Sequence, residues 1–147
     1  MSQPKYYIVA FFVVISSALF SQNTADEDID ILKMRIQNYI TQSGFEAERG
    51  DYYNANLGKA LLIANKIGDK KSEGSIHTKI AKVQFIVEEP ESALISLTKA
   101  AELQRETNDY ANLAITYNVR GILHTSKKEY QVALDYFNSA KTKFEEE

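Results

Sequence analysis

The sequence of 147 residues contains no cysteine and no tryptophan, and only two histidines, two prolines and six glycines. Without cysteine there is no disulfide framework, no thiolate metal site and no cysteine nucleophile. Two histidines leave little for imidazole-rich metal centres. Positive charge is also scarce, since 17 Lys and Arg face 20 Asp and Glu for a net charge of −3. This balance argues against nucleic-acid binding, which needs clustered cationic charge.

Charge is almost absent from the first 21 residues, where Lys5 is the only charged side chain. It is followed by an apolar run from Tyr6 to Phe20. A basic head, an apolar run of this length and small or polar residues after it are typical of a secretory signal peptide. The run is somewhat short for a bilayer-spanning helix, which needs about 20 apolar residues. We therefore expect residues 1–21 to be a signal peptide, with an uncleaved N-terminal anchor as the alternative, and the protein to be exported.

The rest of the chain shows the spacing of helices and no useful run of strand-like alternation. After an acidic linker at residues 22–29, apolar residues recur every three or four positions. Asp69 and Asp109 are suited to cap helix starts, and Pro90 is suited to a first helical turn. The pattern predicts six helices, at residues 29–43, 51–67, 70–87, 91–107, 110–127 and 130–146.

The helical part also repeats itself. A shift of forty residues aligns Ala60 with Ala100 and Ala140 without gaps, and it aligns Asp69 with Asp109. The matching positions are mostly small or apolar, as expected where helices touch one another. This register favours three two-helix units over a helical bundle without repeats.

The third unit, residues 114–147, resembles the tetratricopeptide repeat family, and the forty-residue spacing between units resembles the longer variant of that repeat. The signature positions of the family are matched here by Tyr117, Gly121, Tyr130, Ala133, Phe137 and Ala140. The second unit keeps Ala81, Ala93, Leu97 and Ala100, whereas the first unit is degenerate. The resemblance implies an all-α fold at residues 30–147, in which about three helix–turn–helix repeats stack into a right-handed α-solenoid. The longer variant is common in bacterial proteins, so the resemblance and the expected signal peptide together imply an exported bacterial protein, in the periplasm or on a membrane facing it.

The same resemblance implies a non-enzymatic scaffold that binds a protein or peptide partner in a concave groove, lined by the first helix of each unit. The expected groove positions are Ser75, Thr78, Lys79, Lys82, Phe85, Ile115, Asn118, Val119, Ile122 and Thr125. Among them, the residues expected to contact a partner are Lys79, Lys82, Phe85, Asn118, Ile122 and Thr125. The basic clamp with which some family members hold a C-terminal carboxylate is not matched, because Ile115 and Val119 stand at its basic positions.

No residues form a pattern typical of catalysis, cofactor binding or metal binding. His77 and His124 occupy slots that normally pack in the interior, and their register separates them by about 10 Å along the helices. We expect Tyr117, Tyr130 and Phe137 to pack inside rather than to form a stacking platform for nucleic acid. The lysines between Lys66 and Lys82 alternate with carboxylates, as is common on a solvated helix face.

The C-terminal helix raises a second interpretation, because Phe137, Ala140 and Phe144 give it an apolar side and no polar capping helix follows. This side predicts either self-association or a further segment of a longer chain. In the latter case the chain is the ligand-sensing part of a membrane-spanning signalling protein, such as a histidine kinase or a helix-turn-helix regulator. Contact with a membrane is then expected only through the N-terminal segment or a missing C-terminal span.

Overall fold

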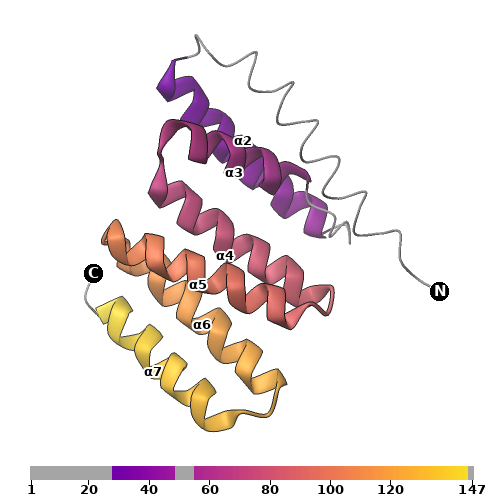
Figure 1. The fold of residues 1–147 in the computed structure, drawn as a ribbon, viewed down its shortest axis with the longest axis vertical. Coiled ribbons are helices and arrows are strands. Elements are labelled where there is room, and N and C mark those ends of the chain that lie inside the picture. Colours follow the sequence, from indigo (N-terminus) through magenta and orange to yellow (C-terminus); the bar gives the residue numbers. More distant parts are fainter. Residues whose placement is uncertain (1–27, 49–54, 146–147) are drawn as a thin grey trace, which may run out of the picture.

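The computed structural model describes residues 28–48 and 55–145, with side chains described outside 45–48. In these residues the chain forms six α-helices and no strand (Figure 1). The helices are α2 (Ile29–Glu48), α3 (Ala55–Ile67), α4 (Lys70–Ile86), α5 (Pro90–Glu106), α6 (Tyr110–Ser126) and α7 (Tyr130–Glu145). None of these helices combines the length and the apolar character needed to cross a membrane. The expected signal peptide and most of the acidic linker lie outside the described residues.

The helices pack mainly against their neighbours in the chain. Figure 1 shows α2 with α3, α4 with α5, and α6 with α7, following one another from one end of the molecule to the other. Contacts between α2 and α4 and between α4 and α6 join the successive pairs. The fold is therefore all-helical and repeat-like, with each pair resting on the next.

The turns between helices repeat every twenty residues. Gly68, Glu88, Asn108 and Lys128 all have a left-handed backbone, with φ of 68°, 64°, 53° and 62°. In each turn the amide of the next residue returns to a carbonyl five positions earlier, as from Glu89 to Gln84 at 2.8 Å and from Asp109 to Gln104 at 2.8 Å. This pattern ends a helix by satisfying its last free carbonyl groups. Identical turns at equal spacing give helices α4, α5 and α6 the same length of 17 residues.

The predicted helix starts are confirmed at three positions. The side chain of Asp69 accepts a hydrogen bond from the amide of Ser72 at 3.1 Å, and that of Asp109 accepts one from the amide of Asn112 at 3.4 Å. Each bond satisfies one of the free N–H groups at the helix start. Pro90 is the first residue of α5, where its missing N–H has no partner to lose.

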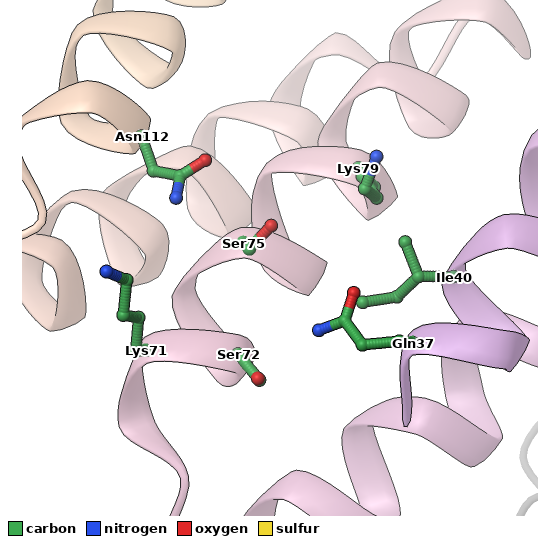
Figure 2. Close-up of a pocket in the computed structure, with 7 residues that line it drawn as sticks. All are labelled: Gln37, Ile40, Lys71, Ser72, Ser75, Lys79 and Asn112. Carbon is green, nitrogen blue, oxygen red and sulfur yellow. The ribbon is translucent and has the colours of Figure 1, made fainter. Parts of the chain in front are cut away.

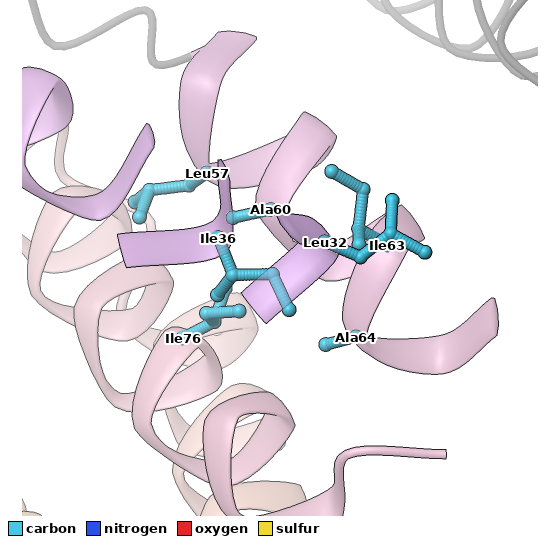
Figure 3. Packing of buried hydrophobic residues seen from close by; sticks show 7 residues of the cluster. All are labelled: Leu32, Ile36, Leu57, Ala60, Ile63, Ala64 and Ile76. Carbon is cyan, nitrogen blue, oxygen red and sulfur yellow. The ribbon is translucent and has the colours of Figure 1, made fainter. Parts of the chain in front are cut away.

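The buried residues follow the forty-residue register. Ala60, Ala100 and Ala140 are all buried, and so are Ile36 and Thr116 on either side of Ile76 in the same register. Figure 3 shows one cluster of the core, in which residues of α2, α3 and α4 meet. Its members are Leu32, Ile36, Leu57, Ala60, Ile63, Ala64 and Ile76. The alanines let the helix backbones approach, and the larger side chains fill the space between them.

The first helix differs from its prediction. A break was expected at Ser43 and Gly44, but α2 continues through Gly44 to Glu48. An added Cβ at Gly44 would have no neighbour within 4 Å, so this glycine is not required by packing. A single glycine inside a helix costs only about 1 kcal/mol, which the helix-favouring residues after it offset. The start of the second helix was expected at residue 51, which lies outside the described residues.

Candidate protein-binding surface

The exposed side of α4 carries a stripe of basic and small polar side chains. Lys71, Ser75, Lys79, Lys82 and Ile86 fall within an arc of about 80° at 3.6 residues per turn, and we call them the α4 stripe. Lys71, Lys82 and Ile86 are exposed, whereas Ser75 and Lys79 are half-buried. The only carboxylate on α4, Glu73, lies on the other side of the helix beside His77. The α4 stripe is therefore a cationic surface without acidic residues of its own.

The equivalent surface of α6 is apolar and neutral. Ile115, Asn118, Ile122 and Thr125 are exposed there, and we call them the α6 row. In the forty-residue register Ile115 follows Ser75, and Ile122 follows Lys82. The exposed fraction of Ile122 is 45%, so a large apolar side chain lies open to solvent. The α4 stripe is thus basic, whereas the α6 row is uncharged and carries two exposed isoleucines.

A polar pocket of about 400 Å³ lies where α2, α4 and α6 meet. Figure 2 shows Lys71 and Lys79 at opposite sides of this pocket, with Ser72 and Ser75 between them. The remaining lining residues are Gln37 and Ile40 from α2 and Asn112 from α6. Amide, hydroxyl and ammonium groups dominate the lining, so the pocket can donate hydrogen bonds to an acceptor.

Two carboxylates lie near the pocket, and both already have partners. Asp69 accepts hydrogen bonds from the amide and hydroxyl of Ser72. Asp109, whose side chain is 3% exposed, accepts from the amide and side chain of Asn112 and lies 4.0 Å from the Lys71 ammonium. The charge of Lys71 is thereby partly balanced.

The other two lysines of the α4 stripe have no such balance. Among the described residues, neither Lys79 nor Lys82 lies within 4.0 Å of a carboxylate oxygen. Partial burial and the nearby Lys79 ammonium both lower the pKa of Lys82. Both effects disfavour the charged form of Lys82, and a nearby anion would favour it.

A buried polar cluster supports the surface from below. Thr116 donates to the side-chain carbonyl of Gln104 at 2.7 Å, and the hydroxyls of Thr78 and Thr116 are 2.7 Å apart. The amide of Gln104 donates to Thr78 at 3.1 Å. These contacts join α4, α5 and α6 and satisfy the three side chains in the interior. The relative position of the α4 stripe and the α6 row is thus fixed by hydrogen bonds as well as by apolar packing.

The predicted site residues do not all occupy the same kind of position. Lys82, Asn118, Ile122 and Thr125 are exposed, and Lys79 is half-buried in the pocket wall. Phe85 is half-buried against an apolar cluster that includes Ala81 and Leu97. Thr78 and Val119, expected to face the groove, are instead buried at 5% and 6% exposure. Their positions on the helices point them toward the core rather than toward a partner.

Only Ser75 and Lys79 of the seven pocket residues were among the expected groove positions. The sequence analysis missed the other five, which are Gln37, Ile40, Lys71, Ser72 and Asn112. Gln37 and Ile40 belong to the degenerate first unit, for which the repeat signature gave no alignment. Asn112 follows Ser72 by forty residues, so the register itself was a signal that could have identified it. Lys71 was interpreted as part of a solvated helix face, because neighbouring carboxylates hid the stripe it forms with Lys79.

The two histidines have separate surroundings. Burial lowers the pKa of His77, with an opposing contribution from Glu73 and a smaller lowering one from Lys99. Among the described residues, the Nδ1 atom of His77 has no hydrogen-bond partner. His124 lies against the carboxylate of Glu129 and stacks on Tyr136 with 5.3 Å between the ring centres. Within the described ranges no group of three or more His, Asp or Glu side chains is arranged to hold a metal ion.

The outer side of α7 carries exposed apolar residues. Leu134 and Phe144 are 50% and 54% exposed. Phe137 is 36% exposed, and its ring lies against Gly121 of α6. Tyr130 is 65% exposed, so the expectation that it packs inside was wrong. It is the first residue of α7. Self-association through Phe137, Ala140 and Phe144 stays a prediction, although Ala140 is itself buried at 6% exposure.

Comparisons of the chain with family models, with curated proteins and with solved structures found no match in any of the three.

Proposed function

We propose that the protein is a non-enzymatic scaffold of the tetratricopeptide type, which binds a protein segment on the face formed by α2, α4 and α6. In this proposal the helix pairs form a short right-handed α-solenoid and the first helix of each pair lines its concave side. The observation that carries it is the recurrence of buried positions at forty-residue intervals together with exposed side chains on the first helices. In such repeats the small residues pack between helices, and the face formed by the first helices is available to bind a partner.

The chemistry of the face supports a protein ligand. It combines exposed isoleucines on the α6 row with amides, hydroxyls and lysines around the pocket. Apolar contacts surrounded by polar groups are typical of protein interfaces. Extended peptides also need donors and acceptors for their backbone, which Asn118 and Gln37 can supply. We further propose that the protein is exported by its first 21 residues and acts outside the cytoplasm.

The proposal is tested by site-specific photo-crosslinking in cells that make the protein. A photoreactive residue at Asn118 on the α6 row is expected to give discrete adducts with one or a few proteins. The matched position is Glu102, which is also exposed but lies on α5, a second helix of its pair. Equal adducts at both positions, or none at Asn118, would contradict the proposed binding face.

A further inference from the structure

We infer that the α4 stripe and the polar pocket recognise an internal acidic segment of the partner protein, through side-chain carboxylates rather than a chain terminus. The inference rests on the proposed function and assigns the chemistry of its ligand. Lys79 and Lys82 are the principal anchors, and the α6 row contacts apolar residues of the same segment.

In the described part of the chain, Lys79 and Lys82 lack the carboxylate partners that several other lysines have. Several other lysines have carboxylate neighbours, as in Lys70 with Glu106, Lys127 with Glu91 at 3.4 Å and Lys141 with Glu145 at 3.8 Å. Lys79 and Lys82 have none within 4.0 Å in the described ranges, although Lys79 is close enough to help lower the pKa of Lys82. A bound carboxylate would oppose this effect and form charge-assisted hydrogen bonds. The pair is therefore complementary to an anion.

The pocket beside Lys79 offers hydrogen-bond donors to an acidic side chain. Its lining contains the amide of Gln37 and the hydroxyl of Ser75 beside Lys79, and the two nearby carboxylates are occupied by Ser72 and Asn112. An acidic side chain entering the pocket thus meets donors more than competing acceptors. A volume of about 400 Å³ accommodates one or two side chains and does not enclose a whole folded domain.

The spacing of the lysines along α4 matches that of side chains in an extended peptide. Lys71 and Lys79 are eight residues apart on one helix, which places them about 12 Å apart along its axis. In an extended peptide, side chains four residues apart are separated by about 13 Å. Two acidic residues at that spacing can each lie beside one of these lysines, and Lys82 lies within one helical turn of Lys79. Intervening residues of the peptide are then free to meet Ile115 and Ile122 of the α6 row.

The test is a selection of random peptides, displayed so that neither peptide end is free, against the purified full chain. We expect the enriched peptides to carry Asp or Glu at two positions about four residues apart, with an apolar residue nearby. Enrichment of peptides without acidic residues would overturn this inference and leave the proposed function standing. Failure to enrich any peptide would count against the proposed function itself.

Binding of the best selected peptide then provides the matched comparison. Replacing its acidic residues by Asn or Gln, or changing the protein to Lys79→Gln with Lys82→Gln, is expected to weaken binding by at least about tenfold, because charge-assisted contacts are lost. The control is Lys99→Gln with Lys141→Gln, which removes the same charge from α5 and α7 and is expected to leave binding within about twofold. Equal losses in the two double variants would show general attraction to cations and would overturn the inference.

Discussion

At the scale of single residues, Gly121 sets how closely α6 and α7 approach. A Cβ at this position would lie 2.5 Å from the Phe137 ring, whereas one at Gly58 would meet nothing within 4 Å. Both glycines lie inside helices, so alanine should improve helix propensity equally at the two positions. The difference between the two substitutions therefore reports on packing alone.

We predict that Gly121→Ala destabilises the fold by about 1–2 kcal/mol, because overpacking outweighs the gain in helix propensity. Gly58→Ala is expected to stabilise it by up to about 1 kcal/mol. Urea unfolding followed by circular dichroism measures both. Equal stabilisation by the two alanines would show that Phe137 moves aside without cost and that the close contact is unimportant.

His77 gives the fold a defined response to pH. Burial holds its pKa below the usual 6.5 in the folded chain, so the unfolded chain binds more protons in the interval below that value. Stability is therefore highest above pH 6.5 and falls as the pH drops from there toward the folded pKa.

We expect His77→Phe to reduce the loss of stability between about pH 7.5 and pH 5.5, since the aromatic replacement fills the slot without a titrating group. The urea midpoint of each protein at the two values measures the effect. His124→Phe is the comparison, because the ring of His124 lies beside Glu129. An unchanged pH dependence in His77→Phe would place the sensitive group elsewhere.

At the scale of the elements, two of the turns between helices hold non-glycine residues in a strained backbone conformation. All four turn residues have a left-handed backbone. Gly68 adopts it without strain and Asn108 tolerates it, whereas it is strained for Glu88 and Lys128. Glu88 and Lys128 are exposed. Replacing either side chain by glycine would therefore remove few stabilising contacts.

We predict that Glu88→Gly stabilises the protein by about 0.5–1 kcal/mol and that Gly68→Ala destabilises it by about 1 kcal/mol. Thermal unfolding of the two variants beside the original chain measures the opposite shifts. A lower melting temperature for Glu88→Gly would contradict the role given to the left-handed turn.

The elements also show what the sequence could predict. Helices α4 to α7 begin and end within one residue of their predicted bounds. Asp69, Pro90 and Asp109 act locally and mark the starts of α4, α5 and α6. The end of α2 was missed because Gly44 resembles a break, although it is tolerated inside the helix. Local signals set helix bounds well where a cap is present and poorly where a lone glycine is the only mark.

At the scale of the whole molecule, the forty-residue register predicted which small residues lie in the core, as Ala60, Ala100 and Ala140 show. It did not predict the pocket, because Gln37 and Asn112 come from helices more than seventy residues apart in the sequence. Nor did it predict that Thr78, Thr116 and Gln104 would satisfy one another in the interior. Contacts of this kind depend on how helix pairs are placed against each other.

Two exposed apolar residues distinguish partner binding on the α6 row from binding on the outer side of α7. Ile122 lies on the α6 row with 45% exposure, and Leu134 lies on the outer side of α7 with 50% exposure. The decisive measurement is the affinity of the best selected peptide for the Ile122→Gln and Leu134→Gln variants, both checked for unchanged stability. Our account predicts about tenfold weaker binding for Ile122→Gln, because a buried isoleucine contact is worth about 1.5 kcal/mol or more, and no change for Leu134→Gln. Loss of binding in Leu134→Gln with full binding in Ile122→Gln would contradict it and assign recognition to α7.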